Sequence, residues 1–147
     1  MKRLIALASA FTLVASVAGA HVTVAPMRSD PGAVQEYELR CHNEGELATT
    51  ALELEIPDGV TVLEVAAVEG GTFELVRTAD RVTSVKWNVT VPANKYVELK
   101  FSAKNPAAEQ EVQWNIRQVL ENGTSVDWSF KPGAAKKGSI TKIGPAE

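Results

Sequence analysis

The sequence predicts an all-β protein, an antiparallel β-sandwich of the immunoglobulin/fibronectin-like kind with about eight or nine strands. Apolar and polar residues alternate with period two in short runs rich in β-branched residues. Pro, Gly, Asn and Asp interrupt these runs at regular spacing, as turns do. No window carries the 3.6-residue period of an amphipathic helix.

The expected strands are identified by the apolar residues that would face the core. In chain order they are Val22 and Val24; Tyr37, Leu39 and Cys41; Leu52, Leu54 and Ile56; the run 60–68; the run 73–78; Val85, Trp87, Val89 and Val91; Val97, Leu99 and Phe101; Val112, Trp114 and Ile116; and Val126, Trp128 and Phe130. Asn122-Gly123 is a strong hairpin signal between the last two.

The N-terminus is typical of a secretory signal peptide. Lys2 and Arg3 precede an apolar run over residues 4–17, and Ala18-Gly19-Ala20 offers the small residues that signal peptidase accepts. A membrane anchor is the alternative, but the run is shorter than the roughly 20 residues a spanning helix needs and no stop-transfer charges follow it. We therefore expect three segments: a signal peptide at 1–20, a sandwich at 21–132 and a C-terminal tail at 133–147. The mature protein would be periplasmic or secreted, without a stable membrane anchor.

Charge and cysteine content limit the function classes. Without Lys2 and Arg3, the 15 basic side chains fall to 13 against 18 acidic ones, so the net charge is −5. An acidic chain without a basic patch disfavours nucleic acid as a partner. Cys41 is the single cysteine, so the core must hold the fold without an internal disulfide.

Cleavage after Ala20 would make His21 the first residue, and a first-position histidine has special chemistry. Its free α-amino group and Nδ1 can close a chelate ring on one metal ion. Both nitrogens can lose their protons to a metal near neutral pH. Two nitrogens with a carboxylate or water favour Cu(II) among divalent ions. A polar residue left by chance at an exposed terminus is the competing interpretation.

Three stretches resemble the YcnI-like family of secreted copper-binding domains: "AHVTVAP" at residues 20–26, "HNEGELATTALELEIPDGV" at 42–60 and "NGTSVDWSF" at 122–130. The resemblance implies an immunoglobulin-like sandwich that holds Cu(II) in a mono-histidine brace. It implies His21 as the chelating residue, Glu44 as the carboxylate ligand and Trp128 as an aromatic neighbour of the metal. Cys41-His42-Asn43 departs from the Val-Pro-Asn-like run expected before this glutamate.

Each of these residues also has a structural interpretation. Glu44 would otherwise be a solvated loop carboxylate, and the alternation places Trp128 in the core with Val126 and Phe130. Cys41 and His42 suggest a blue-copper site, but strand neighbours face opposite sides, so we expect a buried Cys41 and an exposed His42. Met27 is more typical of packing than of a metal ligand.

The expected function is binding of Cu(II), for delivery, acquisition or homeostasis, with the copper ion and a copper-donating or copper-accepting protein as partners. We expect no enzyme activity. One alternative is a copper-dependent monooxygenase, which also begins with a copper-binding histidine but needs a second one, for which His42 is the candidate. The other is an extracellular interaction module without metal. No nucleophilic triad, phosphate loop or paired-cysteine zinc pattern is present.

Overall fold

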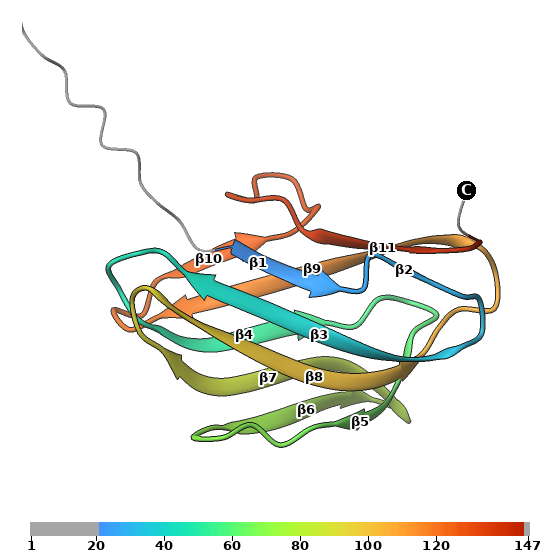
Figure 1. Cartoon of the computed structure of the whole chain (residues 1–147), viewed down its shortest axis with the longest axis horizontal. Coiled ribbons are helices and arrows are strands. Elements are labelled where there is room, and N and C mark those ends of the chain that lie inside the picture. The colour runs from blue at the N-terminus through green and yellow to red at the C-terminus, as the bar shows by residue number, and fades with distance from the viewer. Residues whose placement is uncertain (1–20, 146–147) are drawn as a thin grey trace, which may run out of the picture.

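The protein is described by a computed structural model over residues 21–145, and this part is a sandwich of two β-sheets without helices (Figure 1). The predicted all-β, immunoglobulin-like class is confirmed. The expected signal peptide and its cleavage after Ala20 lie outside the described residues. None of residues 21–145 forms a helix long and apolar enough to cross a membrane.

Eleven strands make up the two sheets. The four-stranded sheet has the order β1-β3-β8-β5, with β1 at His21–Ala25, β3 at Val34–Asn43, β8 at Lys95–Lys104 and β5 at Thr61–Val65. The seven-stranded sheet has the order β2-β11-β9-β4-β7-β6, with β10 also paired to β9. Its members are β2 (Arg28–Ser29), β4 (Thr49–Glu55), β6 (Thr72–Thr78), β7 (Arg81–Val91), β9 (Gln110–Leu120), β10 (Ser125–Trp128) and β11 (Ser139–Ile143). All pairings are antiparallel except that of β11 with β2.

The core lies between the sheets and follows the predicted alternation. Trp87 and Trp114 are fully buried, and an aromatic cluster forms where the indole of Trp114 meets the rings of Tyr37 and Phe101 edge-on, with centroids 5.0 and 5.8 Å away. Such edge-to-face contacts add stabilisation beyond the burial of apolar area. The alternation fails in β6, where Val76 is exposed, because β6 is an edge strand with little packed against it.

The C-terminal segment corrects the expected boundary at residue 132. Residues 139–143, which we expected in a tail, form β11 and pair along β9. Thr141 and Ile143 are almost completely buried, and Thr141 accepts a 2.9 Å hydrogen bond from Nε1 of Trp114. The short Ser-Ile-Thr-Lys-Ile stretch carries too few residues for its alternation to stand out from the Gly/Ala/Lys-rich sequence before it. The sandwich therefore extends beyond residue 132.

Strand β1 is held by both sheets. It pairs with β3 along its whole length. On its other side the backbone N–H of Val24 donates to Oγ of Ser139 at 3.0 Å, and Oγ of Thr141 donates to the carbonyl of Pro26 at 2.8 Å. β1 and the inner strand β11 thus form one seam between the sheets (Figure 1). These contacts fix the position of β1, and therefore of His21 at its start.

Candidate metal centre

His21 begins β1, and its register partner on β3 is His42. The next residues of the two strands, Val22 and Cys41, are 2% and 0% exposed, so they face the core. Because side chains alternate along a strand, both imidazoles lie on the outer face of the four-stranded sheet. The side chain of His21 is 75% exposed and that of His42 is 52% exposed. Both rings are therefore open to solvent on this face.

Glu44 lies one residue beyond the end of β3 and contacts both histidines. One carboxylate oxygen, Oε2, is 3.8 Å from Nε2 of His21, and the other, Oε1, is 3.3 Å from Nδ1 of His42. The Glu44 side chain is 36% exposed, so it lies at the edge of the sandwich rather than free in solvent. The sequence placed His21 and Glu44 in one site only through the family resemblance, and the structure brings the two side chains together.

Asn43 positions the loop that carries Glu44. Its side chain is 1% exposed, and its Nδ2 donates to the carbonyls of Leu47 and Val91, each at 2.9 Å. Its Oδ1 accepts from the backbone N–H of Gly45 at 3.1 Å. The side chain thus closes an Asx-type turn and ties it to the end of β7. We did not predict a role for Asn43 from the sequence, although an Asn directly before a Glu-Gly pair at a strand end is the signal of such a turn.

Trp128 lies at the end of β10 and contributes both to the core and to a groove on the surface. It is 7% exposed and belongs to the core cluster, as the alternation predicts. It also lines a groove between β1 and residues 137–140, together with His21 and Val24. Its Nε1 donates to Oε1 of Gln118 at 3.0 Å, and Nε2 of that buried Gln118 donates to Oγ1 of Thr49 at 2.7 Å. The indole is therefore held rigidly beside the groove that His21 lines.

Arg40 is the cation on this side of β3, and an acidic neighbour pairs with it. Its Nε donates to Oε1 of Glu38 at 3.1 Å, and this hydrogen bond lowers the pKa of the Glu38 carboxyl and raises the pKa of Arg40. Arg40 also lines the groove with His21. The pairing with Glu38 partly offsets the repulsion that the guanidinium would exert on a cation there.

Cys41 is excluded from this outer face. It is fully buried, and burial raises the pKa of its thiol from 9.0 to about 11. A thiolate is the form that binds metals and reacts with oxidants, so at neutral pH Cys41 is a small apolar core residue. The prediction of a buried Cys41 beside an exposed His42 is confirmed. Met27, expected to serve in packing, is instead 75% exposed and lines the same groove as His21.

The donor set fits Cu(II) only in a chain that begins at His21, where the α-amino group is free. Within residues 21–145, no three His, Cys, Asp or Glu side chains are arranged to hold a metal ion in their present conformations. An amine and an imidazole on one residue, with a carboxylate beside them, form a nitrogen-rich set with oxygen, which is the kind that Cu(II) prefers. The exposed His21 ring can turn Nδ1 toward its own backbone nitrogen without disturbing the core.

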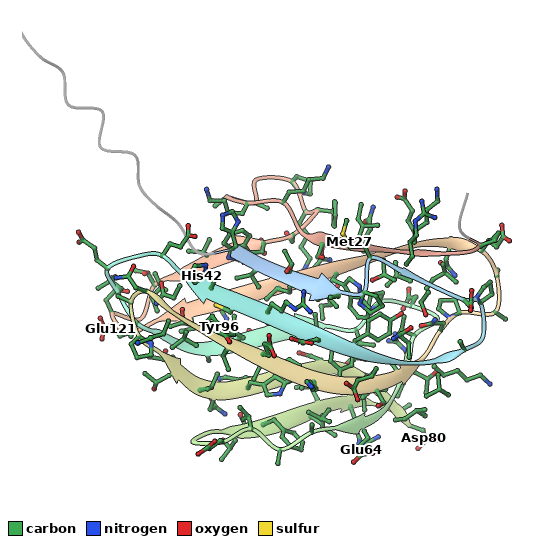
Figure 2. All side chains as sticks on the ribbon, viewed as in Figure 1. Met27, His42, Glu64, Asp80, Tyr96 and Glu121 are labelled. Carbon is green, nitrogen blue, oxygen red and sulfur yellow. The ribbon has the colours of Figure 1, made fainter. Side chains whose placement is uncertain are left out.

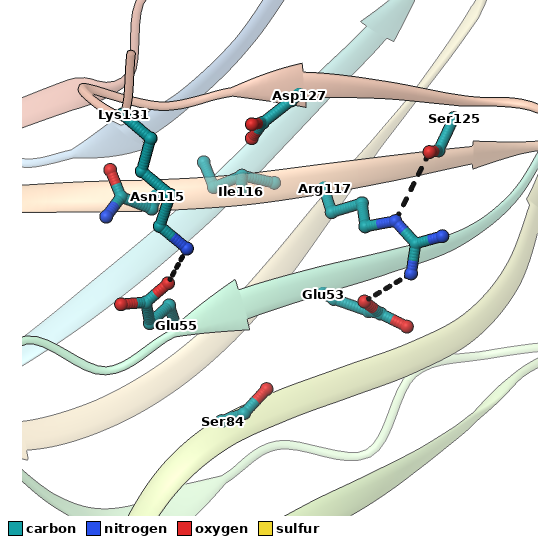
Figure 3. Close-up of a pocket in the computed structure, with 9 residues that line it drawn as sticks. All are labelled: Glu53, Glu55, Ser84, Asn115, Ile116, Arg117, Ser125, Asp127 and Lys131. Atoms are coloured by element: carbon teal, nitrogen blue, oxygen red, sulfur yellow. Dashed lines mark hydrogen bonds and ion pairs between the residues drawn. The ribbon is translucent and has the colours of Figure 1, made fainter. Parts of the chain in front are cut away.

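A second hollow, on the outer face of the seven-stranded sheet, is lined by Asp127 and by two acidic side chains that are paired with basic ones. Nζ of Lys131 lies 2.8 Å from Oε2 of Glu55, and Nη1 of Arg117 lies 3.3 Å from Oε2 of Glu53 (Figure 3). The Arg117 guanidinium also bonds Oγ of Ser125 at 3.2 Å (Figure 3). Acid–base pairs of this kind stabilise a sheet surface modestly and leave little unbalanced charge for a ligand.

The fold and the outer-face cluster define the class: an immunoglobulin-like β-sandwich with a histidine–glutamate cluster at the start of its first strand. Residues 21–146 match the family described as "Domain of unknown function (DUF1775)", and the chain belongs to that family. This confirms the resemblance to the YcnI-like family.

The chain is also similar to a bacterial protein and to solved structures. The chain is 29% identical over 133 residues to the protein of Bacillus subtilis (strain 168) named "Copper-binding protein CutI"; the match covers 88% of this chain and 65% of CutI, just under two thirds of its length. An uncharacterized protein from Nocardia farcinica with an immunoglobulin-like fold has a TM-score of 0.73 at 22% identity, covering 85% of this chain and 99% of that one. A non-cellulosomal cohesin from Archaeoglobus fulgidus has a TM-score of 0.54 at 12% identity, covering 87% and 93%. These two structures support the fold alone.

Proposed function

We propose that the protein is a periplasmic or secreted Cu(II)-binding protein that carries copper at its mature N-terminus, for delivery, acquisition or homeostasis. The observation that carries the proposal is the contact between Glu44 and His21, 3.8 Å from oxygen to nitrogen, at the first residue that the structure describes. The name of the relative CutI and the family membership support copper as the metal. A copper-donating or copper-accepting protein would be its partner.

Three residues of the chain would contribute to the copper site, each in a different way. His21 would supply its α-amino group and Nδ1, which requires its exposed ring to rotate because Nε2 now faces Glu44. Glu44 would supply a carboxylate oxygen, held at the edge of the sandwich by the turn that Asn43 closes. The fixed indole of Trp128 would limit water on the groove side. The amine of His21 is free only after cleavage behind Ala20, so the complete site would form only in the cleaved protein.

The proposal is tested by Cu(II) competition titrations of protein that begins at His21. We expect Glu44→Gln to weaken binding by about 10- to 100-fold, the loss typical for mutations around a metal. Glu46→Gln is the matched control, because Glu46 lies in the same loop, whereas the ion pairs of the two histidines within residues 21–145 are with Glu44. Equal affinities for the two variants would show that Glu44 is not a ligand.

A copper-dependent monooxygenase is the second candidate, and the position of His42 favours it. Enzymes of that kind need a second histidine beside the N-terminal one, and His42 is the register partner of His21. The two candidates differ in turnover. A carrier would bind Cu(II) without oxidising polysaccharide when a reductant is added, whereas an enzyme would release oxidised oligosaccharides that can be detected by mass spectrometry.

A further inference from the structure

His42 occupies the strand position directly opposite the expected chelating residue. Cβ atoms of directly opposed residues in an antiparallel pair lie about 4.5–5.5 Å apart, so two imidazoles on one face can reach a common point. Figure 2 shows His42 at the end of β3, beside Tyr96, its register partner on β8. The outer face thus carries a row of His21, His42 and Tyr96 across three strands.

Glu44 connects the two histidines. Each carboxylate oxygen faces a different ring, Oε2 toward His21 and Oε1 toward His42, and the contact with His42 is the shorter at 3.3 Å. The carboxylate lies between the two imidazoles, so three donor side chains are neighbours on the outer face, although they do not converge on one point in their present conformations. The His42 side chain is about half exposed, so its ring can turn either nitrogen toward the other two donors.

We propose that His42 is a further copper ligand, so that the site holds Cu(II) with the amine and imidazole of His21, the imidazole of His42 and the carboxylate of Glu44. This rests on the proposed function. A third nitrogen would suit Cu(II), whose affinity for nitrogen donors exceeds that of the neighbouring divalent metals. The site would thereby contain two imidazoles where the family resemblance implies one.

The test uses pulsed electron paramagnetic resonance, which counts coordinated imidazoles through their remote nitrogens, together with Cu(II) competition titrations. The protein begins at His21 and is compared with His42→Gln and Tyr96→Ala. We expect two imidazoles in the unmodified protein and one in His42→Gln, with affinity weakened by about 10- to 100-fold. Tyr96→Ala removes the exposed ring next to His42 and should change neither readout.

A protein with one extra alanine before His21 separates this inference from the proposed function. One imidazole in the unmodified protein, with His42→Gln unchanged in spectrum and affinity, overturns the role of His42 while the N-terminal site stands. Equal binding by the extended protein that is lost in His42→Gln supports His42 as a ligand and overturns the amine-dependent site. Absence of binding by every form overturns both.

Discussion

The indole N–H of Trp128 on β10 donates a 3.0 Å hydrogen bond to the side-chain oxygen of Gln118 on the adjacent strand β9. The amide of Gln118 then donates to the hydroxyl of Thr49 on β4. This chain crosses three strands of the seven-stranded sheet, and all three side chains are buried. Trp128 packs in the core and also lines the groove, and these hydrogen bonds therefore fix the orientation of its indole.

Replacing Gln118 with alanine should destabilise the protein by about 1–3 kcal/mol, because the indole N–H and the Thr49 hydroxyl lose their partner inside the core. Urea unfolding would measure the loss. Gln113→Ala is the control, since Gln113 lies on the exposed side of the same strand. Equal midpoints for the two variants would contradict a structural role for the Gln118 contacts.

Asn43→Ala should affect both stability and metal binding. It removes three hydrogen bonds that hold the turn before Glu44. We expect a destabilisation of about 1–3 kcal/mol in urea unfolding. We also expect weaker Cu(II) binding at temperatures where the variant is folded, because Glu44 is no longer held beside His21. Copper affinity equal to that of the unmodified protein would show that the turn does not position the ligand.

The buried thiol of Cys41 should make stability fall with rising pH between about 9 and 11. The folded protein keeps the proton up to a pKa of about 11, whereas the unfolded chain releases it near the ordinary value of 9.0. Between these values the folded state binds more protons, so the free energy of unfolding decreases, by about 2–3 kcal/mol in total. Below pH 9 this group adds no slope.

The difference between the unmodified protein and Cys41→Ala in urea unfolding at pH 8 to 11 isolates this effect. Burial raises the pKa of Tyr37 to about 12, and its contribution is common to both proteins. A difference between the two proteins that does not change with pH would contradict the buried, protonated thiol. Cys41→Ala should leave Cu(II) affinity unchanged, because Cys41 faces the core.

Truncation after Pro132 should destabilise the sandwich strongly. It removes β11, exposes one edge of β9 and takes the buried Ile143 from the core. Because the truncated chain could fail to fold, Thr141→Val provides a milder test. It leaves the N–H of Trp114 and the carbonyl of Pro26 without their partner and should cost about 1–3 kcal/mol. Unchanged thermal midpoints for both variants would restore the tail interpretation.

The sequence predicted the strands that carry alternating apolar residues, including the short β1, and it missed β2 and β11. Trp87 and Trp114 were assigned to the core because each sits in a regular apolar series. Strand β11 was missed because its polar member facing the core, Thr141, is held there by hydrogen bonds that no hydropathy pattern reveals.

The candidate site, too, was predicted from the sequence only in part. The proposal that His21 chelates copper at the N-terminus follows from the chemistry of a terminal histidine. The pairing of His21 with His42 depends on the register between β1 and β3, which are separated by β2 and its loops. Register is set by tertiary packing, so the sequence named His42 as a candidate without placing it beside His21.

We propose above that the α-amino group of His21 binds copper. The most direct measurement is a Cu(II) titration, followed by electron paramagnetic resonance, of the protein that begins at His21 and of the same protein with one extra N-terminal alanine. We expect tight one-to-one binding that the added alanine abolishes while the fold, followed by circular dichroism, is unchanged. Equal affinities and identical spectra for the two proteins would contradict it.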